Sequence, residues 1–209
     1  MPLVDVDLSI DECELPSKVT AFLCEADERI EAFMRYCPGS LAGFVPSDFV
    51  TVYHGLRAIV ETNLASGHSF CEWGSGFGVV TSLASMLEFD ACGIEIEREL
   101  VDAARKLADD FELFTEFIHG SFIPPGSERL AEEAYAADEG ESFWLVTHTD
   151  GAYDELGLDP SDFDLVFAFP WPNEESLIPR LFQSQASEGA LLLTYNQLDS
   201  LRLQRKVST

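Results

Sequence analysis

Residues 69–78 read Ser-Phe-Cys-Glu-Trp-Gly-Ser-Gly-Phe-Gly, so three glycines stand at alternate positions between two apolar runs. The run before the glycines is typical of a short buried strand, and the run after them, which extends to Leu87, is typical of a helix. A glycine-rich turn between a strand and a helix lets the backbone approach a ligand and directs free N–H groups toward it. This stretch therefore predicts an open α/β sheet that binds a nucleotide-like ligand at the carboxyl ends of its strands.

The spacing of these glycines narrows the class of ligand. Gly74, Gly76 and Gly78 give G-x-G-x-G, whereas a dinucleotide-binding loop has the pattern G-x-G-x-x-G, whose third glycine is here replaced by Val79. No Gly-Lys-Ser/Thr follows, so the loop is not a P-loop. The pattern thus disfavours nicotinamide and flavin dinucleotides and excludes P-loop chemistry.

Helices and strands are expected to alternate from the glycine loop onward. Apolar strands are predicted at 69–73, 90–94, 114–119, 164–169 and 190–195, with helices at 79–87, 97–111 and 174–186 between them. Such a series implies right-handed crossovers, and hence a Rossmann-like, doubly wound, mostly parallel sheet with helices on both faces. The tail near 198–203 is expected to add one last strand or helix.

Residues 1–66 are expected to form an N-terminal arm and a helical appendage, and residues 67–209 the ligand-binding domain. An acidic, loosely held arm (1–16) precedes two amphipathic helices, at 17–37 and about 48–64, which can lie across the edge or top of the sheet. A solvent-facing acidic insertion is expected at about 124–162, with a helix over 128–137 and an extra strand or packed loop at 143–146.

The charge of the chain limits its partners. The 209 residues contain 12 Lys and Arg against 38 Asp and Glu, a formal net charge of −26, which disfavours nucleic acid as a partner. The acidity either attracts a basic protein or polyamine or keeps the surface solvated in a salty habitat, and the second interpretation is preferred. Five cysteines without a C-x-x-C pair predict free thiols, and we expect no metal site. No signal peptide or membrane span is readable, so a cytoplasmic protein is expected.

The stretch Glu72-Trp-Gly-Ser-Gly-Phe-Gly78 resembles motif I of the class I S-adenosylmethionine-dependent methyltransferases, in which an acidic residue and one further residue precede G-x-G-x-G. The resemblance covers about residues 50–195. In that family the glycines pass under the methionine part of S-adenosylmethionine, and the acid lies near its ammonium group. The resemblance implies these places for Glu72, Gly74, Ser75, Gly76 and Gly78.

Glu95 ends the next predicted strand, about 20 residues after the glycine loop, which is the separation that a βαβ unit imposes. One carboxylate there can accept hydrogen bonds from both hydroxyls of a ribose. The resemblance further implies that Ile96 packs on the adenine, while Glu97 is expected in the first turn of the next helix. Ser121 stands where many family members have an aspartate that binds the adenine amino group, and Phe122 is placed to cover the ring.

The residues after the fourth strand of the domain, Phe169-Pro-Trp-Pro-Asn173, loosely resemble the [Asn/Asp]-Pro-Pro-[Tyr/Phe] motif of amine methyltransferases. Phe169 lacks the side-chain acceptor of that motif, so base methylation is not inferred. Transfer from a sulfonium needs alignment and exclusion of water rather than a covalent nucleophile. Aromatic faces can stabilise a cation, and a general base can come from a strand end or the insertion. The aromatic candidates, which could stabilise the sulfonium or a cationic substrate, are Tyr53, Phe169 and Trp171, and Phe169 is also expected to bind the cofactor. The candidate bases are His119, His148, Asp150 and Tyr195, with Asn173 as a further catalytic candidate.

The expected function is therefore transfer of a methyl group from S-adenosylmethionine to a small molecule or a protein side chain. The Phe-Ala-Phe-Pro run at 167–170, with Glu-x-Gly-Ser-Gly, also resembles the non-SET histone-lysine methyltransferases in part. Two alternatives stay open: an aminopropyltransferase-like enzyme that uses the decarboxylated cofactor, and a non-catalytic protein that binds S-adenosylmethionine. The methyl acceptor and the oligomeric state are not readable from the sequence.

Overall fold

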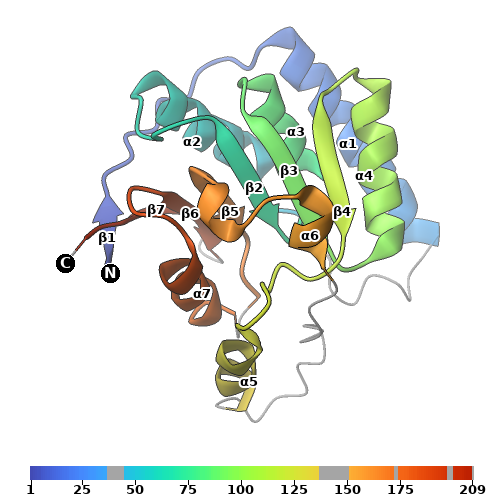
Figure 1. Cartoon of the computed structure of the whole chain (residues 1–209). Helices are drawn as coiled ribbons and strands as arrows, with labels where there is room; N and C mark the ends of the chain where they lie inside the picture. The colour runs from blue at the N-terminus through green and yellow to red at the C-terminus, as the bar shows by residue number, and fades with distance from the viewer. Residues whose placement is uncertain (37–44, 137–150, 172–173, 197–199, 209) are drawn as a thin grey trace.

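A single mixed sheet forms the centre of the computed structural model, which describes residues 1–36, 45–136, 151–171, 174–196 and 200–208. The strand order in this part of the chain is β1-β7-β6-β5-β2-β3-β4 (Figure 1). The strands are β1 (Leu3–Val6), β2 (Ser69–Trp73), β3 (Asp90–Glu95), β4 (Thr115–His119), β5 (Leu165–Ala168), β6 (Leu191–Asn196) and β7 (Ser200–Lys206).

The five strands β2 to β6 are parallel, as predicted, and the two strands at the edge beyond β6 are antiparallel. β7 pairs antiparallel with β6, and β1 pairs antiparallel with β7. The predicted strands are confirmed to within one or two residues, and the tail forms strand β7. The expected α/β fold with a mostly parallel, doubly wound sheet is therefore confirmed.

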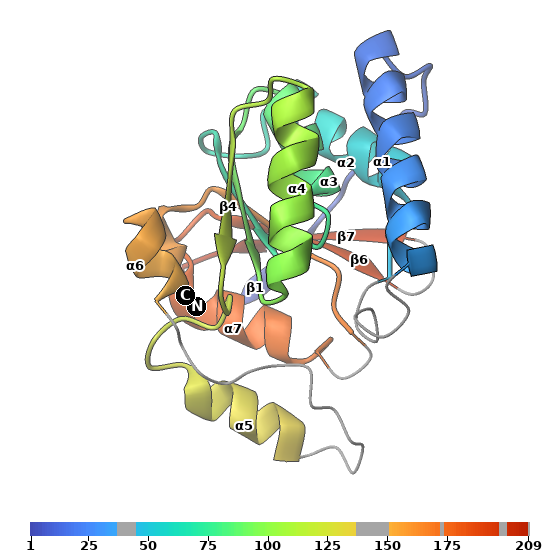
Figure 2. The same ribbon diagram turned by 90° about the vertical axis from the view of Figure 1, so that its right-hand side faces the viewer.

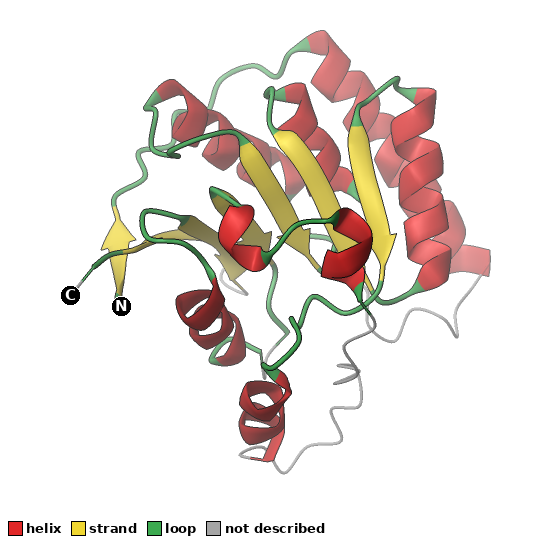
Figure 3. Ribbon diagram, viewed as in Figure 1, coloured by secondary structure: helices red, strands yellow, loops and turns green. Residues whose placement is uncertain are grey.

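Helices cover both faces of the sheet, and Figure 2 shows α6 and α7 on the side opposite α1 and α4. One layer consists of α1 (Ser17–Tyr36), α2 (Phe49–Glu61), α3 (Val79–Met86) and α4 (Arg98–Asp110). The other side carries α5 (Glu128–Ala136), α6 (Ala152–Leu156), the 3₁₀ helix η1 (Pro160–Asp162) and α7 (Leu177–Gln185). The short α6 and η1 were not expected from the sequence (Figure 3).

The alternation of side chains along β2 shows how the two layers are separated. Phe70 packs into the core under α1, α2 and α3, and Glu72 points to the same side, where it binds α3. Cys71 and Trp73 pack into the other core, with α6 and α7. Because β2 is central and buried on both faces, it holds the glycine loop on a rigid support.

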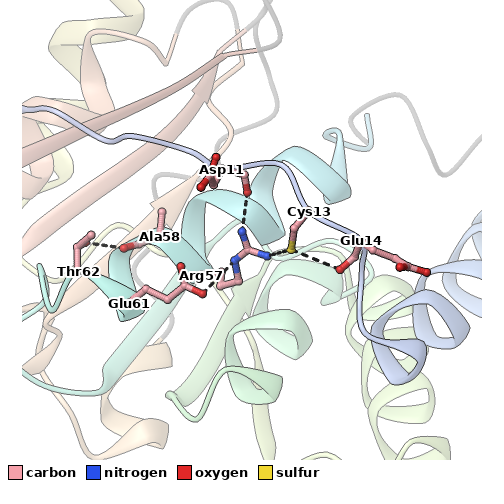
Figure 4. A network of polar contacts seen from close by, with 7 residues as sticks. All are labelled: Asp11, Cys13, Glu14, Arg57, Ala58, Glu61 and Thr62. Atoms are coloured by element: carbon pink, nitrogen blue, oxygen red, sulfur yellow. Dashed lines mark hydrogen bonds and ion pairs between the residues drawn. The ribbon is translucent and has the colours of Figure 1, made fainter.

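The N-terminal segment is bound to the sheet, so the expectation of a loosely held arm is wrong. β1 is the edge strand beside β7, and Arg202 forms two hydrogen bonds with Asp5, at 2.8 and 3.2 Å. Further along, Arg57 of α2 contacts the thiol of Cys13 and the main-chain oxygen of Asp11 (Figure 4). The segment is held mainly by backbone pairing with β7, and such pairing leaves no hydrophobic periodicity in the sequence. Its acidic composition therefore gave no sign of a strand.

The two N-terminal helices contribute to the same hydrophobic core as the sheet. Phe22 of α1 and Val52 of α2 are fully buried in one cluster with residues of β2, β5 and β6. α2 begins where the capping residues predicted it, since the Asp48 side chain accepts hydrogen bonds from the N–H groups of Val50 and Thr51. The helices thus lie on the face of the sheet, in the layer of α3, rather than across its edge. The division at residue 66 stays a prediction.

The predicted acidic insertion is partly described. Residues 137–150 lie outside the described residues, and with them the expected element at 143–146, His148 and Asp150. The segment from Gly151 onward is packed on the molecule rather than facing solvent throughout, because Ala152, Tyr153 and Phe163 are buried against the sheet. The Tyr153 hydroxyl donates to the main-chain oxygen of Phe122, at 2.7 Å. The few apolar side chains of this mostly acidic segment thus anchor it to the sheet.

Candidate functional site

The loop between β2 and α3 is fastened to the neighbouring strand β3. The N–H groups of Gly74 and Ser75 both donate to the main-chain oxygen of Ile94, at 2.9 and 3.0 Å. Gly74, Gly76 and Gly78 all have positive φ angles, of 75°, 52° and 66°. Only glycine adopts this left-handed region without strain, so the alternate glycines allow the backbone to make the turn.

Two of these glycines serve different ends. A Cβ atom on Gly78 would lie 2.3 Å from the ring of Phe117 and 2.8 Å from the Cβ of Ala104, so this glycine permits close packing against β4 and α4. A Cβ atom on Gly74 would meet nothing within 4 Å, and Gly74 is exposed. The loop therefore leaves open space at Gly74, where a ligand can approach the backbone.

Ser75 lies within the loop, but its side chain is turned toward the sheet. A Cβ atom built on Gly93 of β3 would lie 2.6 Å from the Cβ of Ser75 and 2.7 Å from its Oγ. A side chain at position 93 would collide with Ser75, so the packing of Ser75 on β3 requires a glycine there. Any contact between Ser75 and a ligand in the open space would come from the main chain.

Glu95 joins the glycine loop to the segment that follows β3. One of its carboxylate oxygens accepts from the N–H of Gly76 at 2.8 Å, and the other accepts from the N–H of Glu97 at 2.9 Å. The side chain is buried, and burial raises the pKa of this carboxyl, while the backbone hydrogen bonds act in the opposite direction. A carboxylate has about four acceptor positions, and the backbone N–H groups of Gly76, Ile96 and Glu97 occupy only part of them, so the carboxylate can still accept from a hydroxyl.

Glu72 is also buried, and it binds the first turn of α3. Its carboxylate accepts from the N–H of Thr81 at 2.8 Å and from the Thr81 hydroxyl at 2.6 Å. Burial raises the pKa of Glu72 to about 8, the two bonds from Thr81 oppose this shift, and the charge of Glu95 adds to it. A carboxylate at a helix N-terminus is favourable to the helix dipole, so Glu72 also stabilises the start of α3. Sequence reasoning did not anticipate this structural role.

The residues expected near an adenine ring lie at the same edge of the sheet. The N–H of Gly120 donates to the main-chain oxygen of Glu95 at 2.9 Å, which brings the ends of β3 and β4 together. Ile96 is half-buried, and Ser121 is buried and accepts from the N–H of Ile123. The ring of Phe122 stacks on Trp73 with 5.6 Å between centroids and 10° between planes. A contact between these residues and adenine stays a prediction.

Two of the aromatic candidates lie together after β5 and on β6. Phe169 is half-buried and meets buried Tyr195 edge to face, with 5.1 Å between ring centroids. Trp171 is half-buried in the segment that follows. Tyr53, by contrast, is buried in the hydrophobic core under α1 and α3, and this burial raises its pKa. The roles of Tyr53 in cation binding and catalysis therefore stay predictions, and the burial of its side chain does not support them.

The other polar candidates are separated. His119 ends β4 and is half-buried, and its Nδ1 lies 3.1 Å from the guanidinium of Arg98. Asn173 lies outside the described residues. The arrangement thus brings Glu72, the glycine loop and Glu95 together, but it does not identify a general base.

Glu174 is a residue of this region that sequence reasoning missed. It is buried between β5 and α7, and its carboxylate accepts from the N–H of Trp171 at 3.1 Å. Its main-chain oxygen accepts from the N–H groups of Leu177 and Ile178, which begin α7. Burial raises the pKa of Glu174 to about 7, and the charge of Glu95 contributes. The available signal was an acidic residue directly after Phe-Pro-Trp-Pro-Asn at a strand end, a pattern that by itself indicates only the start of a helix.

Neither a metal centre nor a membrane-spanning helix accompanies this site in the part of the chain that the structure describes. Among the described residues, no group of three or more His, Cys, Asp or Glu side chains could hold a metal ion. Within the same ranges, no helix is both long enough and apolar enough to cross a membrane.

Solved methyltransferase structures share the fold of this chain. An RNA methyltransferase from Salinibacter ruber in complex with S-adenosyl-L-homocysteine aligns with a TM-score of 0.51 and 18% identity, over 79% of this chain and 95% of that one. A methyltransferase from Geobacter sulfurreducens aligns with a TM-score of 0.50 and 14% identity, over 92% and 99% of the two chains. No protein-family model and no curated protein matches the sequence. At these identities the likeness concerns the fold, and the chain has the fold of the class I S-adenosylmethionine-dependent methyltransferases.

Proposed function

We propose that this protein is a methyltransferase that binds S-adenosylmethionine at the carboxyl ends of β2 and β3. One observation carries the proposal: the buried carboxylate of Glu95 is bound to the N–H of Gly76, beside the open space at Gly74. A carboxylate in this position supports ribose binding, and the exposed glycine backbone supports a ligand that crosses the loop.

Each part of the cofactor has a chain segment that suits it. Glu95 would accept hydrogen bonds from the ribose hydroxyls, and the half-buried Ile96 would pack on the adenine. The loop backbone at Gly74 would lie along the methionine part. Glu72 would attract its ammonium group through charge, because a nearby cation favours the ionised form of a buried carboxyl.

Bound S-adenosylmethionine supplies an electrophilic methyl group on a sulfonium. The chain then has to hold the acceptor in line with that methyl group and keep water away. Phe169 and Tyr195, which pack edge to face next to the end of β5, are suited to form an apolar wall for this purpose. A covalent nucleophile is not required.

The proposed acceptor is a small molecule or a protein side chain. The formal net charge of −26 opposes binding of a polyphosphate chain, which separates this proposal from the RNA methyltransferase activity named for the Salinibacter protein. A radiolabelled methyl assay on fractionated lysate would compare incorporation into protein, small molecules and RNA. Labelling confined to RNA would contradict the proposed acceptor class.

Calorimetric titration tests the cofactor site. We expect the wild type to bind both S-adenosylmethionine and S-adenosylhomocysteine, and Glu95→Ala to lose at least about tenfold in affinity for each, because charge-assisted hydrogen bonds to ribose are removed. Glu97→Ala is the matched control: its side chain is exposed, and its N–H, which donates to Glu95, is retained.

Four results would contradict parts of the proposal. Absence of binding to the wild type would refute the cofactor, and an unchanged affinity of folded Glu95→Ala would refute the ribose assignment. Tighter binding of decarboxylated S-adenosylmethionine than of the intact cofactor would favour the aminopropyltransferase alternative. Binding without transfer to any lysate fraction would favour a non-catalytic protein.

A further inference from the structure

Glu174 lies at the place where the connections of the sheet change direction. β5, β2 and β3 are neighbours in the sheet. β2 continues into α3 on one face, whereas β5 continues into α7 on the other. In open α/β sheets, ligands bind outside the carboxyl ends of the strands at such a point. Glu95 ends β3 and Glu174 follows β5, so the two residues lie after the strands on either side of β2, at the same edge of the sheet.

Both carboxylates are buried, and the charge of Glu95 acts on Glu174. Glu174 is 8% exposed and Glu95 is 7% exposed. The negative charge of Glu95 helps to raise the pKa of Glu174. Within the described residues, their hydrogen-bond donors are backbone N–H groups, that of Trp171 for Glu174 and those of Gly76, Ile96 and Glu97 for Glu95, and no lysine, arginine or histidine side chain is paired with either of them. Buried carboxylates without a cationic partner are electrostatically unbalanced, and a bound cation would balance them.

We propose that Glu174 is a specificity residue of this site, which acts together with Glu95 to favour the positively charged methyl donor over the neutral thioether product. This inference depends on the proposed function. S-adenosylmethionine and S-adenosylhomocysteine differ by one methyl group and by the positive charge on sulfur. A carboxylate near the sulfur therefore strengthens binding of the donor and leaves binding of the product almost unchanged. Transfer of the methyl group removes the attraction, so the product is released more readily.

Glu174 also has a structural role, which the test has to separate from the electrostatic one. Its carboxylate accepts from the N–H of Trp171 while its own N–H donates to the Trp171 oxygen at 2.8 Å, and this reciprocal pair forms the turn before α7. A glutamine has nearly the same shape, and its amide oxygen accepts the same hydrogen bond. Glu174→Gln thus keeps the turn and removes the charge.

The experiment measures the dissociation constants of S-adenosylmethionine and S-adenosylhomocysteine for wild type, Glu174→Gln and Glu174→Ala. We expect Glu174→Gln to weaken binding of the donor by about tenfold, the size of a charge interaction of this kind at a partly screened site, with less than about a twofold change for the product. Glu175→Gln is the matched control, because its side chain is the exposed neighbour in the same segment. In Glu174→Ala we also expect a lower melting temperature, since the turn is lost.

The same preference can be followed in the wild type alone. Lowering the pH from about 7.5 to about 6 protonates the buried carboxyl of Glu174, whose pKa is raised to about 7, and should reduce the ratio of donor to product affinity by about fourfold. Equal weakening of both ligands in folded Glu174→Gln, or no weakening, would overturn the inference. A ratio that is constant over this pH range would also overturn it. Failure of the wild type to bind either ligand would instead refute the proposed function.

Discussion

Burial of Glu72 and Glu174 predicts that the ligand-free protein becomes less stable as the pH rises through neutrality. Burial raises the pKa of Glu72 from 4.5 to about 8 and that of Glu174 from 4.5 to about 7. Between these limits the folded state binds more protons than the unfolded state, in which both carboxyls are ionised. Stability therefore falls as the pH rises through this window. A carboxylate that is ion-paired in the folded state has the opposite effect, because its pKa is lowered by folding.

The magnitude follows from the two shifts. Between about pH 6 and about pH 8, Glu72 stays mostly protonated in the folded state and costs about 2 kcal/mol, and Glu174, which ionises midway, costs about 1 kcal/mol more. The sum of about 3 kcal/mol is a large part of the stability of a typical domain, which is about 5–15 kcal/mol. For a chain of this size it corresponds to a fall in the melting temperature of about 6–12 °C.

Thermal unfolding followed by circular dichroism at several pH values checks this prediction, with the ionic strength held constant. Glu72→Gln keeps the acceptor for the Thr81 N–H and removes the titrating group. The fall in its melting temperature between about pH 6 and about pH 8 should therefore be smaller than that of the wild type by about two thirds. Glu97→Gln is the control, since Glu97 is exposed and its variant should follow the wild type. A melting temperature that is constant or rises from about pH 6 to about pH 8, or an unchanged slope in Glu72→Gln, would refute the reasoning.

Two further predictions concern the glycine loop and the surface charge. Gly78→Ala should destabilise the fold by about 3 kcal/mol or more, because the new methyl group would overlap the ring of Phe117 and the φ angle is positive, whereas Gly74→Ala should cost only about 1–2 kcal/mol from its φ angle and should weaken cofactor binding. Urea unfolding and calorimetry measure both effects, and equal loss of stability in the two variants would contradict the packing role of Gly78. Raising KCl from about 0.1 to about 1 M should increase the melting temperature, because salt shortens the screening length from about 10 to about 3 Å around a chain with a net charge of −26. A melting temperature that falls over this range would contradict self-repulsion of the acidic surface.

Local sequence patterns were sufficient for most of the sheet and for the glycine loop. The strand at Ser69–Trp73 was predicted to the residue, because a short, mostly apolar segment between Gly67 and Gly74 has few alternatives. The separation of Gly76 and Glu95 follows from the length of a βαβ unit, and the structure places a hydrogen bond of 2.8 Å between them. The regular part of the site was thus predictable because its residues belong to adjacent elements of the chain.

Features that depend on distant parts of the chain were not predictable. β1 is a strand only because β7, almost two hundred residues later, offers a free edge. Tyr153 is buried because it packs in an apolar cluster with residues of β2, β5 and α7, where its hydroxyl donates to the main-chain oxygen of Phe122. Glu174 reads as a polar residue at the start of a helix, and its importance arises from burial beside Glu95.

The sequence by itself determined the order of most elements and the parallel sheet, and it predicted where a nucleotide-like ligand would bind, since these follow from hydrophobic periodicity and from the turns that only glycine adopts without strain. Tertiary structure alone decided which carboxylates lie at the same edge of the sheet as the glycine loop, and which of them are removed from water. An electric charge acts through space rather than along the chain, so the chemistry of Glu72, Glu95 and Glu174 is set by burial and proximity.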